Sequence, residues 1–382
     1  MNFSLEALQA ADGDCLLLHY QTEGSRPVHV LIDGGSKGIY QSVLKPRLDK
    51  LAVAQQLNLR AVIVSHIDAD HITGIVDFFK DMKETGDNNE ELPYRIQSLW
   101  HNSFQKLHHG KTATVASAAV VSASTSGALV PGLSDDVVAV VASVPQGNQV
   151  RNYATQLGVP INKEFCGNLV CAAEDQMPVI KVADGLTFSI LGPSTKELDD
   201  LEEAWNKAKS KSADPTAQAA DYLNRTVPNL SSIVILAEVA NAARPTPYRM
   251  LLTGDAGCDV IWEAIQRYRL VKDNHFHVDL LKASHHGSRH SVDQDFLEKV
   301  TADSYVFSGN GKHDNPHRDV LEWLSDARKD QPYNAYFTNR VMITDELTAT
   351  LQDFLNKEKT CRPMHRYHFR TDPQLSIEIK LV

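Results

Sequence analysis

The chain has 382 residues, of which 42% are hydrophobic and 23% are charged, a mixture typical of soluble globular proteins rather than disordered chains. Its formal net charge of −10 excludes a protein that coats nucleic acid through a broad basic surface, whereas phosphates could still bind in a metal-lined cleft. The chain shows no run of about 18 apolar residues, and the first residues have neither a basic start nor an apolar run, so we expect no membrane span, no secretory leader and a cytoplasmic location. We expect the five cysteines, which show no CxxC spacing, to be reduced and mostly buried.

The first part of the chain reads as short strands followed by alternating strands and helices. Apolar runs predict strands at 16–19, 28–32 and 61–64, and helical spacing predicts helices at 41–56 and 72–82. Residues 103–165 are rich in Ala, Ser, Thr and Val, and we interpret them as a helical insertion. The insertion could cover an active site or form a homodimer or partner contact, and composition does not choose between these roles.

The second part continues the alternation. Strands are predicted at 179–182, 186–191, 232–236, 248–252, 278–281, 304–307 and 375–381, and helices at 197–209, 259–268, 292–300 and 320–328. This order predicts a layered α/β fold with two sheets and outer helices.

Polar residues gather where predicted buried strands end, which is where α/β folds place their sites. The strongest cluster lies at 65–71, with His66, Asp68, Asp70 and His71 as candidate metal ligands. The plain alternative is an exposed polar turn whose aspartate caps the next helix.

Two further motifs follow later strands. Asp255 ends the sequence LLTGD, although turns favour Gly-Asp without any metal. His285 and His286 begin the sequence HHGS. Adjacent residues at a strand end point in different directions, so we expect one histidine to bind metal and the other either to contact substrate or to support the metal ligands from behind.

Taken in order, these motifs resemble those of metallo-β-lactamase-fold hydrolases, in which HxHxDH precedes a Gly-Asp and a final His. The resemblance is closer to the hydrolase domain of the DNA-uptake protein ComEC and its soluble stand-alone relatives. It is carried by DGD at 12–14, IDGG at 32–35, NLS at 229–231 and LKASHHGS at 281–288. The resemblance implies a four-layer αββα metallo-β-lactamase sandwich, with 1–382 as a single domain and 103–165 as a helical insertion within it.

The chain departs from the family pattern at two metal ligands. Asp68 stands where HxHxDH has its second histidine, and Asn229 and Ser231 occupy the region of a separate downstream histidine. We therefore expect one secure divalent-metal site, for Zn²⁺ or Mn²⁺, and a weaker second site. The predicted metal ligands are His66, Asp68, Asp70, His71, Asp255 and His286.

The resemblance implies metal-assisted hydrolysis. Asp70 is expected to orient the attacking water and accept its proton, while His285 helps to position an oxyanion. The candidate substrate-binding residues are Asn229, Ser231, Lys282, Ser288, Asn310 and His313.

The expected function is that of a phosphodiesterase or nuclease acting on a phosphodiester substrate, with DNA as the first choice. One alternative is hydrolysis of a small molecule such as a cyclic nucleotide or a lactone. Another is a degenerate fold that serves as a binding module or as one component of a multi-protein defence system.

Overall fold

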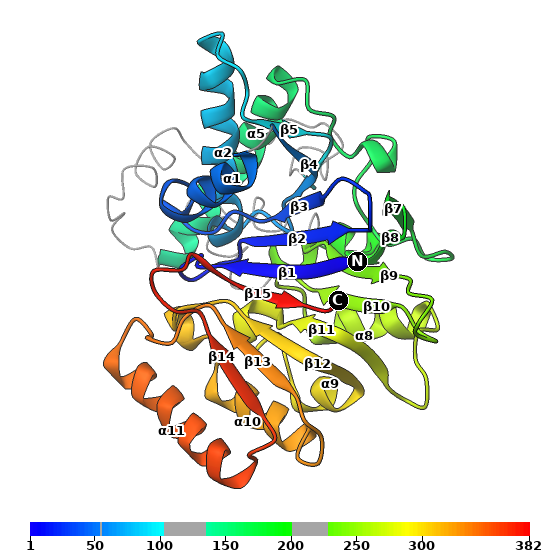
Figure 1. Ribbon diagram of the computed structural model, residues 1–382, viewed down its shortest axis with the longest axis vertical. Coiled ribbons are helices and arrows are strands. Elements are labelled where there is room, and N and C mark those ends of the chain that lie inside the picture. Colours follow the sequence, from blue (N-terminus) through cyan, green and yellow to red (C-terminus); the bar gives the residue numbers. More distant parts are fainter. Residues whose placement is uncertain (54–55, 103–134, 201–227) are drawn as a thin grey trace.

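The computed structural model describes residues 1–53, 56–102, 135–200 and 228–382. Within these residues two β-sheets pack face to face, and helices cover the outer face of each sheet (Figure 1). The predicted four-layer αββα sandwich is therefore confirmed. The single-domain assignment over 1–382 stays a prediction.

The first sheet is formed by seven of the described strands and joins the two ends of the chain. Strands β1, β2, β3 and β15 pair antiparallel, whereas β4 pairs parallel with β3, β5 and β6. Both termini lie near the middle of the view in Figure 1, where β1 and β15 run side by side. In sheet order the strands are β15 (Ser376–Lys380), β1 (Asn2–Leu8), β2 (Leu16–Gln21), β3 (Val28–Ile32), β4 (Leu57–Ile63) and β5 (Tyr94–Ile96), and β6 (Leu99–Trp100) pairs with β4.

The second sheet is formed by eight of the described strands. Its antiparallel part runs from β7 to β10, and its parallel part runs from β10 to β14. In sheet order the strands are β14 (Arg366–Phe369), β13 (Asn334–Phe337), β12 (Val300–Phe307), β11 (Phe276–Lys282), β10 (Tyr248–Leu252), β9 (Val234–Val239), β8 (Leu186–Gly192) and β7 (Val179–Ala183).

Alternation along the strands divides the apolar residues between the central and the outer layers. On β2, Leu16 and Leu18 face the second sheet, whereas Leu17 faces the helices of the first sheet. On β10, Met250 and Leu252 face the first sheet in the same way. The sheets are therefore fixed to each other by one continuous buried layer that positions the loops at their edges.

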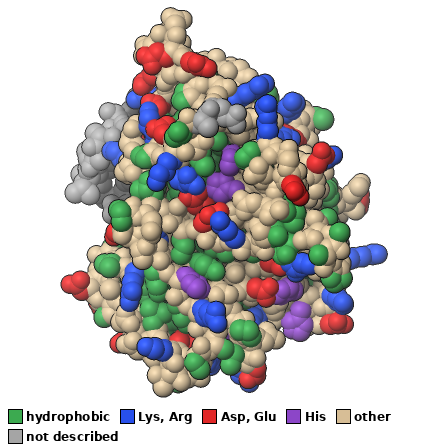
Figure 2. Space-filling view, viewed as in Figure 1, with side chains coloured by type: hydrophobic (Ala, Val, Ile, Leu, Met, Phe, Trp, Pro, Cys, Tyr) green, Lys and Arg blue, Asp and Glu red, His purple; other side chains and the backbone are tan. Residues whose placement is uncertain are grey.

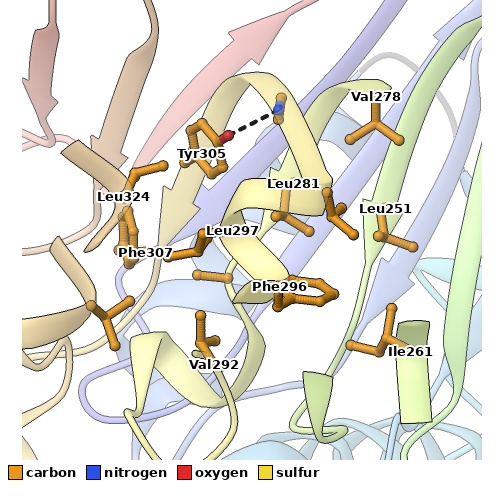
Figure 3. Close-up of a cluster of buried hydrophobic side chains, with 14 of the residues drawn as sticks. Leu251, Ile261, Val278, Leu281, Val292, Phe296, Leu297, Tyr305, Phe307 and Leu324 are labelled. Atoms are coloured by element: carbon orange, nitrogen blue, oxygen red, sulfur yellow. Dashed lines mark hydrogen bonds between the residues drawn. The ribbon is translucent and has the colours of Figure 1, made fainter. Parts of the chain in front are cut away.

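In the described part of the first half, three helices cover the first sheet. They are α1 (Lys45–Ala52), α2 (Ala69–Asp87) and α5 (Asp135–Gln156). Four of the described helices cover the second sheet, and their apolar side chains form a core with Leu251, Leu281 and Phe307, shown in Figure 3. These helices are α8 (Cys258–Arg267), α9 (Gln294–Lys299), α10 (Arg318–Ala327) and α11 (Asp345–Cys361).

Two predicted helices differ in their bounds. The helix expected at 41–56 is a π-helical turn, Tyr40–Leu44, followed by α1, which has a proline in its first turn. Proline lacks an N–H and suits that position, so the α-helix begins there. The helix expected at 72–82 begins earlier, at Ala69, with Asp68 as its N-cap residue.

Elements that were not predicted from the sequence include β1, β13 and α11. In β1 the apolar residues Phe3, Leu5 and Ala7 alternate with polar residues, so the pattern of a strand was present in the sequence, and the polar Ser4 and Glu6 are buried as well. Helix α11 buries only Leu351, Phe354 and Glu358, so its apolar period is weak.

The predicted insertion at 103–165 is described only from residue 135, where α5 begins, and α5 packs against α2 through Val150 and Ala154. Most of the helix predicted at 197–209 also lies outside the described residues. All five cysteines are free, but only Cys15 is buried, so the expectation of mostly buried thiols is wrong. Among the described helices, none is both long and apolar enough to span a membrane.

Candidate metal centre

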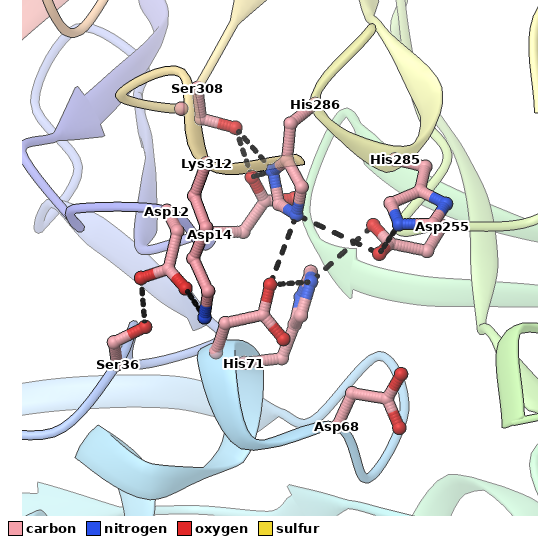
Figure 4. A network of polar contacts seen from close by, with 12 residues as sticks. Asp12, Asp14, Ser36, Asp68, His71, Asp255, His285, His286, Ser308 and Lys312 are labelled. Atoms are coloured by element: carbon pink, nitrogen blue, oxygen red, sulfur yellow. Dashed lines mark hydrogen bonds and ion pairs between the residues drawn. The ribbon is translucent and has the colours of Figure 1, made fainter. Parts of the chain in front are cut away.

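The site is built at the edge of the sandwich where strands of both sheets end. Residues 65–71 follow β4, and Asp255 and His286 follow β10 and β11. Asp14 comes from the loop between β1 and β2, at the other side of the same cluster (Figure 4). In Figure 2, histidine and charged side chains gather near the centre of the molecular face.

Four buried residues bring ligand atoms to one point. One such atom from each of Asp14, His71, Asp255 and His286 lies within 4.8 Å of the other three. Nε2 of His71, Nε2 of His286 and Oδ1 of Asp255 are buried without a hydrogen-bond partner. Because an unpaired buried polar atom costs about 1–3 kcal/mol, this grouping calls for a ligand that satisfies several of them at once.

The distances between these atoms fit metal ligands better than hydrogen bonds. Ligand atoms about 2.1 Å from a tetrahedral ion lie about 3.4 Å from one another. Nε2 of His71 is 3.4 Å from Oδ1 of Asp255 and 3.7 Å from Oδ2 of Asp70. Nε2 of His286 is 3.3 Å from Oδ2 of Asp70 and 3.6 Å from Oδ2 of Asp255. Asp70, His71, Asp255 and His286 therefore fit one divalent ion.

A carboxylate behind each imidazole sets its tautomer. Nδ1 of His71 donates to Oδ2 of Asp33 at 2.9 Å, and Asp33 also accepts from the backbone N–H and the hydroxyl of Ser65. Nδ1 of His286 lies 3.2 Å from Oδ1 of Asp14. With the proton held on Nδ1, each Nε2 presents a lone pair to the site, which is the form in which imidazole binds metal.

Asp14 is better described as a positioning residue than as a ligand. Its Oδ2 pairs with Nζ of Lys282 at 2.7 Å, and its Oδ1 accepts from Ser308 and faces His286. Both carboxylate oxygens thus have protein partners. Neither Asp14 nor Asp33 was predicted as a site residue, although both stand in the DGD and IDGG motifs of the family resemblance. The available signal was a carboxylate beside an apolar strand.

Lys282 is buried beside the site. Its side chain is 0% exposed, and Nζ donates to Asp14 and to the carbonyl oxygen of Ala283. The structure shows Lys282 as a partner of Asp14, and its contact with a substrate stays a prediction. The pair joins β11 of one sheet to the β1–β2 loop of the other.

The expectation that His285 and His286 point in different directions is wrong, because both rings point toward Asp255. Nε2 of His285 lies 3.7 Å from Oδ2 of Asp255, and Nε2 of His286 lies 3.6 Å from the same oxygen. The two residues do not continue β11 but form a turn in which both have positive φ, 48° and 56°. Strand alternation therefore does not apply to them.

The first motif contributes one more buried imidazole. Nε2 of His66 has no hydrogen-bond partner and lies 3.6 Å from Oδ2 of Asp68 and 3.7 Å from Oδ2 of Asp255. Both His66 and Asp68 thus face the site as the sequence motif predicts.

The remaining predicted substrate-binding residues surround the site in several loops. Nδ2 of Asn229 lies 3.3 Å from Nδ1 of His285. Ser231 and Ser288 are buried, and Oγ of Ser288 accepts from the N–H of His290. Asn310 and His313 lie in the loop after β12, where Oδ1 of Asn310 accepts from the N–H of Lys312. Their contact with a substrate stays a prediction.

Burial and neighbouring charges shift the pKa values of the site residues in opposite directions. Burial disfavours the charged imidazolium of His71, but Asp255 and Asp70 outweigh that effect and raise the pKa of His71 well above its ordinary value. The same balance, with Asp255 and Asp14 as the nearest carboxylates, raises the pKa of His286 to about 9. Burial raises the pKa of Asp255, yet the neighbouring imidazoles hold it well below its usual range. A divalent ion would replace the protons that balance these carboxylates.

Comparison with known proteins agrees with this site. The family described as the Metallo-beta-lactamase superfamily matches residues 28–117, which include Asp33 and the first motif. Among solved structures, the chain is similar to the metallo-beta-lactamase fold protein YhfI from Bacillus subtilis, with 10% identity, 100% of each chain covered and a TM-score of 0.37. No curated protein matches the chain.

The superfamily match and the buried His/Asp cluster together indicate a metal-dependent hydrolase. The donor set of imidazoles and carboxylates fits a divalent ion without fixing its identity.

Proposed function

We propose that this protein is a metal-dependent phosphodiesterase or nuclease. The observation that carries the hydrolase part is the set of partnerless atoms on His71, His286 and Asp255, which meet at ligand-to-ligand distances. The phosphodiester part rests on the motif resemblance to ComEC-type domains. The net charge of −10 is compatible with a substrate gripped at a few phosphates rather than along a broad basic surface.

Each residue has a separate task in this proposal. A divalent ion held by Asp70, His71, Asp255 and His286 would supply Lewis acidity that lowers the pKa of water and offsets phosphate charge. Asp70, whose side chain is 27% exposed, orients the attacking water and takes its proton. Burial raises the pKa of Asp70, but His71 and His286 outweigh it and keep the carboxylate ionised at neutral pH. Asp33 and Asp14 hold the imidazoles.

The test combines metal loading with a substrate panel. The chain is stripped with a chelator, reloaded with Mn²⁺ or Zn²⁺, and assayed on plasmid, single-stranded DNA, RNA, bis-nitrophenyl phosphate, cyclic nucleotides and a lactone. We expect Mn²⁺-dependent phosphodiester cleavage. Asp70→Asn should lower the rate about a thousandfold, equivalent to about 4 kcal/mol of transition-state stabilisation, with unchanged thermal unfolding of the metal-free protein.

Asp303→Asn is the matched control. Asp303 also lies 3.7 Å from a histidine, His277, but both side chains are exposed, so this change should not alter the rate. If Asp70→Asn cleaves as fast as the parent, Asp70 is not catalytic. Cleavage of the lactone or a cyclic nucleotide alone would favour the small-molecule alternative. Failure to bind any metal would favour the binding-module or defence-component alternative.

The cytoplasmic location and a homodimer or partner contact through 103–165 stay predictions.

A further inference from the structure

We propose that Lys312 binds an anionic phosphate of the substrate beside the metal centre, and that Asp12 positions the ammonium group of Lys312 for this contact. The contact rests on the proposed phosphodiester function and gives that function a substrate-binding cation. Asn310 and His313 of the same loop were predicted from the sequence to bind substrate, whereas no role was predicted for Lys312 or Asp12.

A phosphodiester meets strong negative charge at the metal centre. A bound divalent ion and the ammonium of Lys282 balance three of five carboxylates there, because metal-bound imidazoles are neutral. The substrate brings one more negative charge, so a further ammonium at its binding position reduces the repulsion that it meets. The five carboxylates, each within 3.7 Å of a site histidine, are those of Asp14, Asp33, Asp68, Asp70 and Asp255.

The two aspartates of the DGD motif pair with two lysines that differ in exposure. Oδ2 of Asp14 lies 2.7 Å from Nζ of Lys282, whose side chain is 0% exposed. Oδ2 of Asp12 lies 2.6 Å from Nζ of Lys312, whose side chain is 48% exposed (Figure 4). Because an ammonium group has three N–H donors, Lys312 can contact Asp12 and a phosphate oxygen together. Of these two lysines, Lys312 is the one that a ligand can reach.

Gly13 places the Asp12–Lys312 pair next to Asp70. A Cβ atom on Gly13 would lie 1.8 Å from the carbonyl oxygen of Asp70, so the two backbones are in close contact. Asp12 directly precedes Gly13 in the chain. The ammonium group that Asp12 holds therefore lies beside the residue that is proposed to orient the attacking water.

The loop after β12, which carries Lys312, also reaches the metal centre. The hydroxyl of Ser308 donates to Oδ1 of Asp14 and lies 3.2 Å from Nδ1 of His286. In Figure 4, Lys312 extends from this loop toward Asp12. Lys312 thus connects two loops that both contact the candidate ligands.

The turn that carries Lys312 is fixed by several hydrogen bonds. The N–H of Lys312 donates to Oδ1 of Asn310 at 3.1 Å, and the carbonyl oxygen of Asn310 accepts from the N–H of Ile343 at 2.7 Å. The N–H of Gly311 donates to the carbonyl oxygen of Asn315 at 3.0 Å. A binding group on a fixed turn loses less conformational entropy when its ligand binds.

Asp12 fixes the direction of the ammonium group. Its Oδ2 accepts from Lys312, and its Oδ1 accepts from the hydroxyl of Ser36 (Figure 4). The side chain of Asp12 is only 12% exposed, and both of its oxygens have protein partners. Asp12 is therefore a positioning residue, and Lys312 is the residue that contacts the phosphate.

The first test measures phosphate binding. Inorganic phosphate is titrated by calorimetry into the Mn²⁺-loaded parent, Lys312→Met and Lys312→Arg. Lys312→Met keeps the length of the side chain without its charge and should bind phosphate at least about tenfold more weakly. Lys312→Arg keeps the charge and should stay within about threefold of the parent. Mn²⁺ affinity and thermal unfolding should be unchanged in both variants.

Lys45→Met is the matched control. Lys45 also lies 2.6 Å from an aspartate, Asp81, and its side chain is 35% exposed. Asp81 follows Asp70 on α2 by eleven residues, which is about 16 Å along the helix. Loss of this ion pair should therefore leave phosphate binding as it is in the parent.

Steady-state kinetics on bis-nitrophenyl phosphate provides the second readout. A contact made equally in the bound substrate and in the transition state changes KM and leaves kcat unaltered. We expect KM to rise at least about tenfold in Lys312→Met and to be restored in Lys312→Arg. A merely structural role would instead lower the thermal stability and would not be restored by arginine.

Parent-like phosphate binding in folded, Mn²⁺-loaded Lys312→Met would overturn the contact, and so would a parent that binds metal but no phosphate. If such a parent still cleaves phosphodiesters, the proposed function holds and the role of Lys312 does not. Weaker phosphate binding in Lys312→Met, without cleavage of any phosphodiester by the parent, would support the contact and contradict the proposed reaction. If the parent binds no metal, both fail.

Discussion

Two buried histidine–carboxylate clusters in this protein differ in how their ring nitrogens are used. Beneath α10 and α11, Nδ1 of His365 contacts Oε2 of Glu358 at 2.9 Å, and Nε2 contacts the carbonyl oxygen of Arg328 at 3.0 Å. In the candidate metal centre, Nδ1 of His71 and of His286 faces a carboxylate, while each Nε2 has no partner.

The difference separates a structural cluster from a candidate functional one. Both clusters are buried and both contain the same residue types, so composition and burial do not distinguish them. A fold that leaves several ring nitrogens unpaired at one point loses stability there, unless something binds that point. The unpaired atoms, and not the histidines as such, therefore mark the site.

The largest expected effect follows from Asp255→Asn. This change removes the charge of the buried carboxylate that faces both His71 and His286, so metal binding should be lost, and hydrolysis should fall at least about a thousandfold. The metal-free variant should remain folded. Calorimetric metal titration and thermal unfolding measure the two outcomes. Parent-like metal affinity in Asp255→Asn would contradict the interpretation of the unpaired ring nitrogens.

The second largest effect is expected from Asp14→Asn, which should change both the stability of the fold and the affinity for metal. The variant leaves the ammonium of Lys282 buried without its charge partner, which should destabilise the protein by about 3–5 kcal/mol. It also removes the carboxylate behind His286 and should weaken metal binding about 10–100-fold. Denaturant unfolding and metal titration check both effects. If Asp14→Asn binds metal more weakly but unfolds like the parent, Asp14 positions His286 without stabilising the fold. Unchanged metal binding would exclude that positioning role.

The pH dependence of stability tests a third, fully paired cluster on the first sheet. Burial raises the pKa of Glu6, but His19, Arg47 and Ser376 outweigh it and lower the pKa to about 2, from 4.5 in the unfolded chain. A depressed pKa stabilises the fold above pH 4.5, and that contribution, about 3 kcal/mol, is lost as the pH falls from 4.5 to about 2. Denaturant unfolding should show this slope in the parent. The slope should be smaller in Glu6→Gln, and an equal slope in both would assign it to other groups.

The smallest effect should come from Glu358→Gln. The substitution disturbs hydrogen bonds from Ser325 and Tyr367 to the buried carboxylate and should cost about 1–3 kcal/mol of stability. Metal affinity and hydrolysis should not change. A loss of metal binding here would remove the distinction between the structural and the candidate functional cluster.

The sequence was informative where a residue's role follows from its local surroundings. Buried strands such as β3 and β10 could be predicted because their apolar runs are nearly continuous. The candidate ligands follow directly after strands of this kind. His66, Asp70 and Asp255 could therefore be singled out without a structure. By contrast α11 was missed because it buries few residues, whereas β1 was missed although its apolar and polar residues alternate as in a strand.

By itself the sequence determined the layered α/β class and the strand-end motifs, since apolar periodicity and short-range spacing are local properties of the chain. Only the tertiary structure decided how the motifs combine. The β1–β2 loop brings Asp14 against Lys282 and His286, and the left-handed turn directs His285 toward Asp255 rather than away from it. Such pairings depend on how two sheets pack and on backbone angles in one turn, and no local pattern of residues encodes them.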